Sequence, residues 1–194
     1  MVDASGSAPH DWARGLAVRR QILCAAVLAL AVSTAQASNK TNTFSVGPDA
    51  VIETGDTFVQ DGVRYRLFGV QACLPGTRAE LASGASEDCG SISVTGLAGL
   101  MRDATPMCVE IGRSDWRGMP YVFTSCSMAI GGRSIELGTA LIASGLAFAS
   151  LTPEGAPVHV PYLAAEAVAQ EQRQGIWSSE AFVHPARALL QLRD

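Results

Sequence analysis

The sequence predicts an α+β fold that is mainly β, in which five short strands and about three helices form a small barrel. Two observations lead to this fold class. Residues that favour β-structure occur in short runs separated by Gly, Pro and Asp, which is typical of strands joined by tight turns. Apolar residues at helical spacing are confined to a few longer segments.

Five runs of β-forming residues give the expected strands, at residues 49–53, 57–60, 63–70, 107–111 and 121–128. The run 63–70 is the strongest of the five, and the Asp61-Gly62 pair before it is a strong hairpin signal. Residues 114–120 are expected to form the turn between the last two strands. Residues 74–87 are expected to form a loop, because they combine proline, glycine and small polar residues.

Three segments are expected to be helical, at residues 91–102, 134–144 and 161–174. Ser134 is expected to cap the second helix and Gly145 to end it, while Pro161 opens the third helix and Gly175 terminates it. Five short strands with interposed helices match the OB-fold, a five-stranded and partly open Greek-key barrel.

The N-terminus predicts a cleavable secretory signal peptide over residues 1–37. Two arginines precede an uncharged apolar run, 22–32, and Ala35-Gln36-Ala37 is a small-x-small cleavage signal before Ser38. Retention as a membrane anchor is the alternative, but the apolar run is too short to span a bilayer. We therefore expect a periplasmic or secreted protein with no transmembrane span after cleavage.

The length of 194 residues suits one domain plus a processing segment. After the signal peptide we expect a polar leader at 38–50, a single domain at 51–180 and a C-terminal tail at 181–194. Cleavage would remove three of the 14 Lys and Arg residues and two of the 18 acidic residues, which leaves five more negative than positive charges.

This charge balance bears on the class of partner. Proteins that hold nucleic acid through its phosphates usually present a basic face. Arg64 and Arg66 share one face of their strand because side chains alternate along it. The remainder of the mature chain is acidic, so strong non-specific binding of nucleic acid is not expected.

Four cysteines follow the predicted cleavage site: Cys73, Cys89, Cys108 and Cys126. An even number in an exported protein indicates two disulfides, for which three connectivities exist. Geometry favours Cys73–Cys89, between the loop after strand 63–70 and the next helix, and Cys108–Cys126, between two strands. A four-cysteine metal site is the alternative, but the spacings include no Cys-x-x-Cys pair.

The most informative motif is Gly55-Asp56-Thr57, followed about ten residues later by Arg66-Leu67-Phe68-Gly69-Val70. The predicted hairpin brings the Asp56 carboxylate close to the Arg66 guanidinium. A carboxylate for a metal and an arginine for a phosphate are the minimum parts of a site that cleaves phosphodiesters. The following residues, 71–74, contain no acidic side chain that could be a second metal ligand.

This motif resembles the staphylococcal nuclease (thermonuclease) family, in order and spacing, over roughly residues 51–178. The resemblance extends to three later segments, at residues 115–120, 135–147 and 162–178. It implies a thermonuclease-like OB barrel, and exported relatives with similar cysteine placement strengthen the disulfide pairing above. In that family, calcium lies between two aspartates, a glutamate activates water and two arginines hold the phosphate.

Carried over residue by residue, the resemblance gives Asp56 as the first calcium ligand and Arg66 as the first arginine. Gln71 stands at the second aspartate, Leu74 at the glutamate and Met119 at the second arginine. One carboxylate and one amide carbonyl make at most a weak Ca²⁺ site, and no cofactor is otherwise expected. Loss of the general base and of an arginine would each lower the rate of cleavage.

These observations leave three hypotheses. The first is an exported thermonuclease-like domain with a degenerate site, in which Asp56 and Arg66 form a structural ion pair and the protein is a non-catalytic binding or accessory module. The second is an active, calcium-dependent periplasmic nuclease. The third follows from a similarity at residues 68–74, 135–141 and 157–162 to the thermonuclease-like succinoglycan (exopolysaccharide) biosynthesis proteins of rhizobia. It implies an oligosaccharide or envelope component as partner, which is otherwise unknown.

Overall fold

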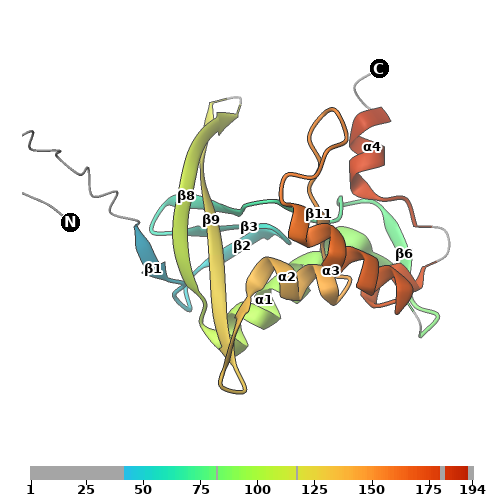
Figure 1. Ribbon diagram of the computed structural model, residues 1–194, viewed down its shortest axis with the longest axis horizontal. Helices are drawn as coiled ribbons and strands as arrows, with labels where there is room; N and C mark the ends of the chain where they lie inside the picture. Colours follow the sequence, from blue (N-terminus) through green and yellow to red (C-terminus); the bar gives the residue numbers. More distant parts are fainter. Residues whose placement is uncertain (1–41, 82, 117, 180–181, 192–194) are drawn as a thin grey trace, which may run out of the picture. The chain divides into compact units, whose positions relative to one another are not determined.

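One strongly curled sheet of seven strands forms the centre of the protein (Figure 1). A computed structural model describes residues 42–191 apart from 82, 117 and 180–181, so the predicted signal peptide lies outside the described residues. The strand order is β1-β8-β9-β4-β3-β2, with β10 paired to β9. The strands are β1 (Thr43–Ser45), β2 (Val51–Thr54), β3 (Thr57–Gln60), β4 (Val63–Leu67), β8 (Met107–Trp116), β9 (Met119–Ile130) and β10 (Arg133–Glu136).

Two small sheets and the helices complete the described part of the chain. The small sheets pair β5 (Val70–Gln71) with β11 (Phe148–Ala149), and β6 (Arg78–Glu80) with β7 (Ser86–Asp88). The helices are α1 (Cys89–Ala104), α2 (Leu137–Ala143), α3 (Val160–Glu171), the 3-10 turn η1 (Gly175–Ser178) and α4 (Pro185–Gln191). Helices α1, α2 and α3 lie together on one side of the β8–β9 hairpin (Figure 1). None of the described helices has the length and hydropathy to cross a bilayer.

The predicted class, a mixed fold made mostly of strands, is confirmed, and so is the hairpin at Asp61-Gly62. Both residues have positive φ, 53° and 74°, as a two-residue turn between twisted antiparallel strands requires. The turn joins β3 and β4, which pair from Thr57 opposite Arg66 to Gln60 opposite Val63. The predicted count of five strands is not confirmed, because β1 and β10 extend the main sheet to seven.

Several predicted boundaries were wrong. Ser134 does not cap a helix but lies in β10, and Glu136 caps α2 by accepting hydrogen bonds from the amides of Gly138 and Thr139 at 3.0 and 2.6 Å. A carboxylate can accept hydrogen bonds from two amides at once, so Glu136 caps α2 in preference to Ser134, two residues earlier. The expected turn at 114–120 is shorter, because β8 and β9 continue pairing to Trp116 and Met119. The expected loop at 74–87 contains β6 and part of β7.

The fold buries two apolar clusters. The larger lies between the sheet and helices α1 and α2, and its fully buried members include Phe58, Leu67, Leu97 and Leu141. The smaller surrounds Phe148 near the C-terminal segment. It includes the Cys73–Cys89 disulfide, so this bridge is part of a core and not only a surface link.

Both predicted disulfides are present, Cys73–Cys89 and Cys108–Cys126. The first joins the segment after β5 to the first residue of α1, with the Cα atoms 5.5 Å apart. The second joins residues that stand directly opposite each other on β8 and β9. The sequence separations of 16 and 18 residues correspond to about 3 kcal/mol each in the chain-entropy account of cross-linking.

We therefore expect the double substitution Cys108→Ala and Cys126→Ala to lower the free energy of unfolding by about 3 kcal/mol, because the denatured chain regains the freedom that the bridge removes. Urea denaturation of both proteins measures the difference. Non-reducing peptide mapping of the unsubstituted protein is the control. Free thiols at these positions, or an unchanged midpoint in the double variant, would contradict the prediction.

A partly buried hydrogen bond joins α3 to Glu136, the residue that caps α2. The Tyr162 hydroxyl donates to Oε1 of Glu136 at 3.0 Å, and the Tyr162 residue is only 4% exposed. The contact requires a glycine on α2, because a Cβ at Gly138 would lie 2.3 Å from the hydroxyl oxygen. Burial, together with the neighbouring Glu136 carboxylate, raises the pKa of Tyr162 well above its ordinary value.

This raised pKa predicts a loss of stability in alkali. Tyrosine in the unfolded chain ionises near pH 10, whereas Tyr162 stays protonated when folded, so the free energy of unfolding falls as the pH rises above about 10. Tyr162→Phe should reduce this dependence and lower stability at neutral pH by about 1–2 kcal/mol, because Glu136 loses a donor. Denaturation across pH measures both effects. Tyr121→Phe, outside this contact, is the matched control, and equal alkaline slopes in Tyr162→Phe and the unsubstituted protein would contradict the prediction.

Candidate functional site

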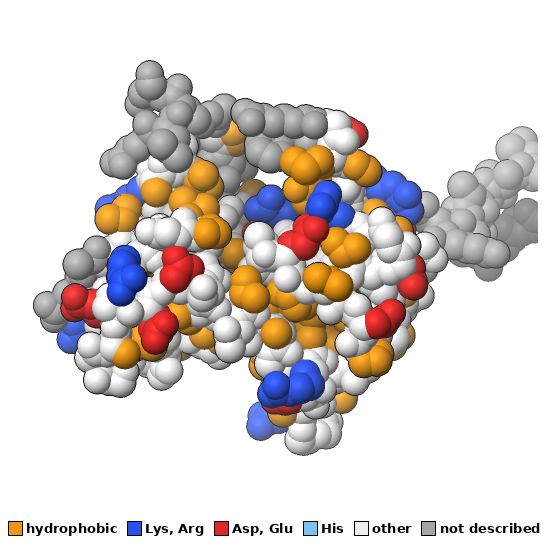
Figure 2. Space-filling model, turned by 180° about the vertical axis from the view of Figure 1, so that it is seen from behind, with side chains coloured by type: hydrophobic (Ala, Val, Ile, Leu, Met, Phe, Trp, Pro, Cys, Tyr) orange, Lys and Arg blue, Asp and Glu red, His pale blue; other side chains and the backbone are white. Residues whose placement is uncertain are grey.

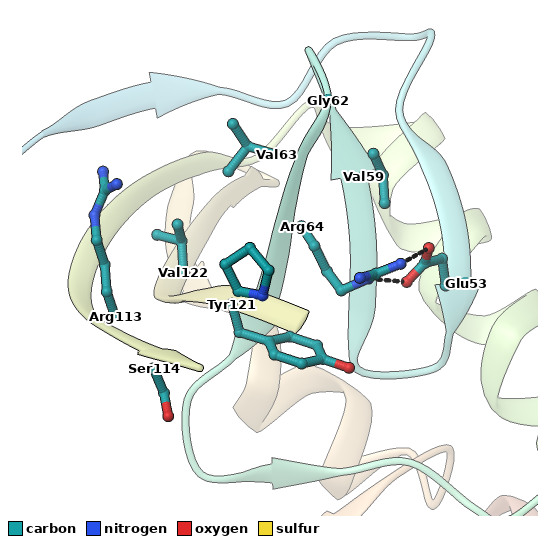
Figure 3. A pocket seen from close by; sticks show the side chains of 10 residues that line it. Glu53, Val59, Gly62, Val63, Arg64, Arg113, Ser114, Tyr121 and Val122 are labelled. Atoms are coloured by element: carbon teal, nitrogen blue, oxygen red, sulfur yellow. Dashed lines mark hydrogen bonds and ion pairs between the residues drawn. The ribbon is translucent and has the colours of Figure 1, made fainter. Parts of the chain in front are cut away.

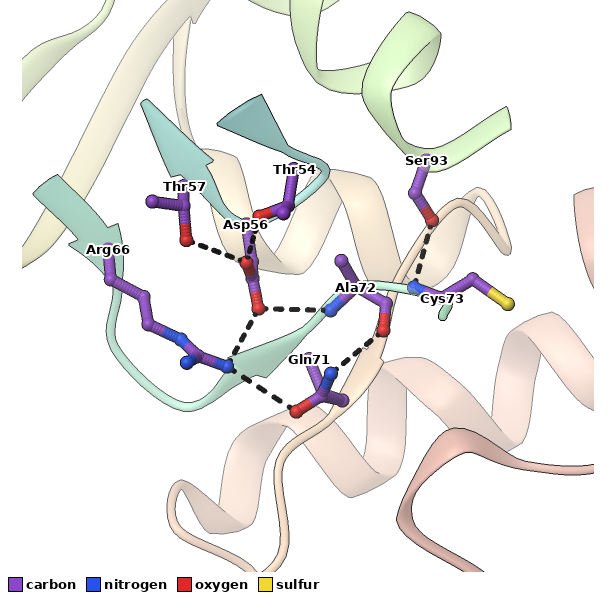
Figure 4. A network of polar contacts seen from close by, with 8 residues as sticks. All are labelled: Thr54, Asp56, Thr57, Arg66, Gln71, Ala72, Cys73 and Ser93. Atoms are coloured by element: carbon purple, nitrogen blue, oxygen red, sulfur yellow. Dashed lines mark hydrogen bonds and ion pairs between the residues drawn. The ribbon is translucent and has the colours of Figure 1, made fainter. Parts of the chain in front are cut away.

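Asp56 lies in the tight turn between β2 and β3, not on a strand, and is 3% exposed. The turn packs against α1 so closely that a Cβ at Gly55 would lie 2.3 Å from the Ser93 Cβ. Only glycine fits there without displacing the helix. The Gly-Asp-Thr sequence therefore has a structural reason, because it lets the turn approach α1 while the aspartate points into the protein (Figure 4).

The Asp56 carboxylate accepts four hydrogen bonds (Figure 4). Its Oδ1 accepts from the hydroxyls of Thr54 and Thr57 at 2.6 and 2.8 Å. Its Oδ2 accepts from the Ala72 amide at 3.1 Å and from Nη2 of Arg66 at 3.0 Å. An ionised carboxylate has about four lone-pair positions, so this one is saturated by the protein itself.

Arg66 reaches Asp56 from β4, where it stands opposite Thr57. The same Nη2 approaches Oε1 of Gln71 at 3.4 Å, and the Gln71 amide group donates to the Ala72 carbonyl at 2.9 Å. The Arg66 side chain is 34% exposed, so part of the guanidinium faces solvent. The structure thus brings Asp56, Arg66 and Gln71 together, as the motif predicts. Arg66 contacts both of the other side chains.

The other positions carried over from the nuclease family add no charge to this network. Leu74 follows β5 in a loop, and Met119 begins β9. Arg66 pairs with Phe123 on β9, and Met119 lies four residues before Phe123 on the same strand. Asp88, at the end of β7, caps α1 by accepting from the Ser91 amide at 2.9 Å.

The donor set around Asp56 does not fit calcium. Ca²⁺ takes six to eight oxygen ligands and binds mainly through carboxylates. Here both oxygens of the carboxylate already accept hydrogen bonds. The position of the second carboxylate holds the amide of Gln71, and the Arg66 guanidinium contacts both Asp56 and Gln71. A cation would have to compete with two hydroxyls at Oδ1, or with the Ala72 amide and Arg66 at Oδ2.

The geometry instead supports the structural interpretation of the pair. The four donors come from the end of β2, the start of β3, strand β4 and the segment after β5. One buried carboxylate therefore ties together four separate pieces of backbone. A buried charge is tolerated when its hydrogen bonds are complete, and this arrangement completes them.

Arg64 does not form a free basic patch with Arg66. Its guanidinium makes two hydrogen bonds to the carboxylate of Glu53 on β2, at 2.6 and 2.8 Å. Each of the two arginines thus has its own carboxylate. Figure 2 likewise shows basic and acidic side chains intermixed on the face that it presents.

A buried carboxylate on α3 was missed in the sequence. Glu166 is 6% exposed and accepts from the Ala149 amide at 2.6 Å, from Nε2 of His184 at 3.1 Å and from Gln170 at 3.2 Å. His184 also accepts from the Ala186 amide through Nδ1 at 3.1 Å, so both of its ring nitrogens are engaged. The only signal in the sequence is a glutamate among small apolar helix residues. This set anchors α4 to α3 and leaves neither nitrogen free for catalysis.

No protein-family model matches the sequence, and no curated protein matches it. The nuclease resemblance therefore rests on the order and spacing of the motifs.

Removal of the Asp56 carboxylate should be strongly destabilising. We expect Asp56→Ala to lower the free energy of unfolding by about 3–5 kcal/mol, because it leaves a cation and three further donors without their acceptor. Asp103→Ala is the matched control, since Asp103 forms an exposed pair with Arg102 and should contribute less than about 1 kcal/mol. Denaturation of the three proteins tests this. An Asp56→Ala protein as stable as the original would show that the carboxylate is not a structural centre.

Proposed function

We propose that this chain is an exported OB domain of the thermonuclease type that lacks phosphodiesterase turnover and serves as a binding or accessory protein of the cell envelope. The observation that carries the proposal is the saturation of Asp56, which is buried and accepts four hydrogen bonds from its own chain. A metal ligand must offer free lone pairs to the cation, and this carboxylate offers none.

The chemistry of cleavage supports the same proposal. Attack on a phosphodiester by water needs a base to accept the proton of the water and positive charge to stabilise the developing oxyanion. Leu74 and Met119 supply neither a base nor a charge at the positions where the family has them. Among the family's site positions, only Arg66 keeps a group that can bind a phosphate. Its guanidinium is already in contact with Asp56 and Gln71.

The envelope location is supported by the two disulfides, which form and persist in oxidising compartments. The acidic balance of the chain disfavours a polyanionic ligand. OB barrels bind oligosaccharides as well as oligonucleotides, so the exopolysaccharide role that the resemblance implies is compatible with the charge.

The direct test is a cleavage assay on the protein purified from an exporting host. We expect no cleavage of supercoiled plasmid or single-stranded DNA, with calcium or with chelator, because the site around Asp56 offers neither a free metal ligand nor a base. We also expect calcium to leave the thermal midpoint unchanged, since a ligand stabilises only a fold that binds it. Calcium-dependent cleavage that Asp56→Ala abolishes would overturn the proposal in favour of an active nuclease.

A gain-of-function variant tests the thermonuclease part of the proposal. The combination Gln71→Asp, Leu74→Glu and Met119→Arg adds two carboxylates and a guanidinium at the family positions, and should raise calcium affinity in a calorimetric titration. The combination with Gln71→Asn in place of Gln71→Asp is the matched control, because it keeps an amide. Equal calcium affinity in the two proteins would contradict the assignment of Gln71 to the metal position.

A further inference from the structure

A groove of about 510 Å³ opens where the β8–β9 hairpin separates from β4 (Figure 3). The separation follows from the register of the sheet. Strand β4 pairs with β9 only from Tyr65 to Leu67, whereas β9 begins at Met119, three residues before the partner of Tyr65. Arg64 and Glu53 line one wall of the groove, Arg113 and Ser114 the other.

A planar ion pair is fixed on the first wall. Nε and Nη2 of Arg64 donate to Oε2 and Oε1 of Glu53 at 2.6 and 2.8 Å. The guanidinium carbon lies 5.5 Å from the centre of the Tyr121 ring, within cation–π range. The side chains of Arg64 and Glu53 are 29% and 34% exposed, so the pair is held in place and still accessible (Figure 3).

This pair presents donors and acceptors side by side without net charge. A guanidinium has five N–H donors, of which Glu53 takes two. Each Glu53 oxygen accepts one bond from Arg64 and keeps a further lone pair. The hydrogen bond from Arg64 lowers the pKa of Glu53, so the carboxylate remains an acceptor at neutral pH.

Hydroxyl groups match this pattern, and phosphates do not. A hydroxyl both donates and accepts, so two neighbouring hydroxyls can bond to Arg64 and Glu53 together. A phosphodiester oxygen only accepts, and it would be repelled by Glu53. The cation of the second wall is neutralised too, because Arg113 makes two hydrogen bonds to Glu110.

The rest of the groove is apolar. Val59, Val63, Pro120 and Val122 line it beside the Tyr121 ring. A ligand that carries hydroxyls on one edge and C–H groups on its faces would satisfy both surfaces. Sugar rings have this character, whereas a nucleic acid strand brings one negative charge with each nucleotide.

We propose that this groove binds a neutral oligosaccharide, with vicinal hydroxyls on the Arg64–Glu53 pair and a sugar face on Tyr121 and the neighbouring valines. The inference deepens the proposed binding role and rests on it. We expect the groove to bind and release the oligosaccharide without cleaving it. Among the described residues that line the groove, Glu53 is the only carboxylate.

NMR titration of the purified protein with two glucose hexamers of different linkage, cellohexaose and laminarihexaose, tests the proposal. We expect at least one hexamer to shift the amides around Arg64 and Tyr121. Arg64→Gln and Tyr121→Leu should each weaken that affinity about tenfold, the usual effect of losing one hydrogen bond to a charged group or one stacking surface. Arg102→Gln, the same change in an exposed pair on α1, is the matched control and should have no effect.

Glu53→Gln distinguishes the ligand classes. It should weaken hexamer binding and strengthen binding of a single-stranded thymidine oligonucleotide, because Arg64 then loses its counter-charge. Absence of binding by both hexamers would overturn the inference, as would binding that Arg64→Gln and Tyr121→Leu leave unchanged. Oligonucleotide binding in the groove of the unsubstituted protein, without hexamer binding, would assign the site to nucleic acid instead. A plasmid cleavage assay on the same samples separates the two proposals. Protein that neither cleaves plasmid nor binds the hexamers would contradict oligosaccharide binding in the groove but not the proposed loss of nuclease activity.

Discussion

The saturated carboxylate of Asp56 is the interaction on which the centre of the structure depends. It ties the β2–β3 turn, which packs against α1 through Gly55, to Arg66 on β4 and to the Ala72 amide after β5. A buried charge with complete hydrogen bonding tolerates little change around it, because each lost donor leaves an uncompensated lone pair. The same completeness removes the carboxylate from chemistry, so stability and catalysis make opposite demands on this residue.

Local features of the fold could be predicted from the sequence, and long-range ones could not. The Asp61-Gly62 hairpin depends on two residues with positive φ, and the cysteine pairs follow from strand and helix positions, so both were predicted correctly. The edge strand β1 depends on pairing with β8, far along the chain. The contact of Glu136 with Tyr162 on α3 is likewise long-range. The motif around Asp56 indicated which residues meet, but the threonine hydroxyls and the Ala72 amide that saturate the carboxylate become apparent only in three dimensions.

A second theme is the pairing of arginines on the sheet with carboxylates of their own. Arg64 pairs with Glu53 on β2, Arg66 with Asp56 in the β2–β3 turn, and Arg113 with Glu110 on the same strand, β8. The more exposed pairs, Arg64–Glu53 and Arg113–Glu110, add little to stability. Their larger effect is on recognition, since a surface of neutral, oriented pairs selects ligands by the geometry of their hydrogen bonds and not by net charge.

The two disulfides also make the folded state depend on where the chain resides. In a reducing compartment the bridge after β5 and the bridge between β8 and β9 are both absent. The small cluster around Phe148 then holds Cys73 and Cys89 without a covalent bond between them. The denatured chain there keeps the freedom that the bridges would remove, so the folded form is less stable. The protein therefore gains its full stability only in an oxidising compartment.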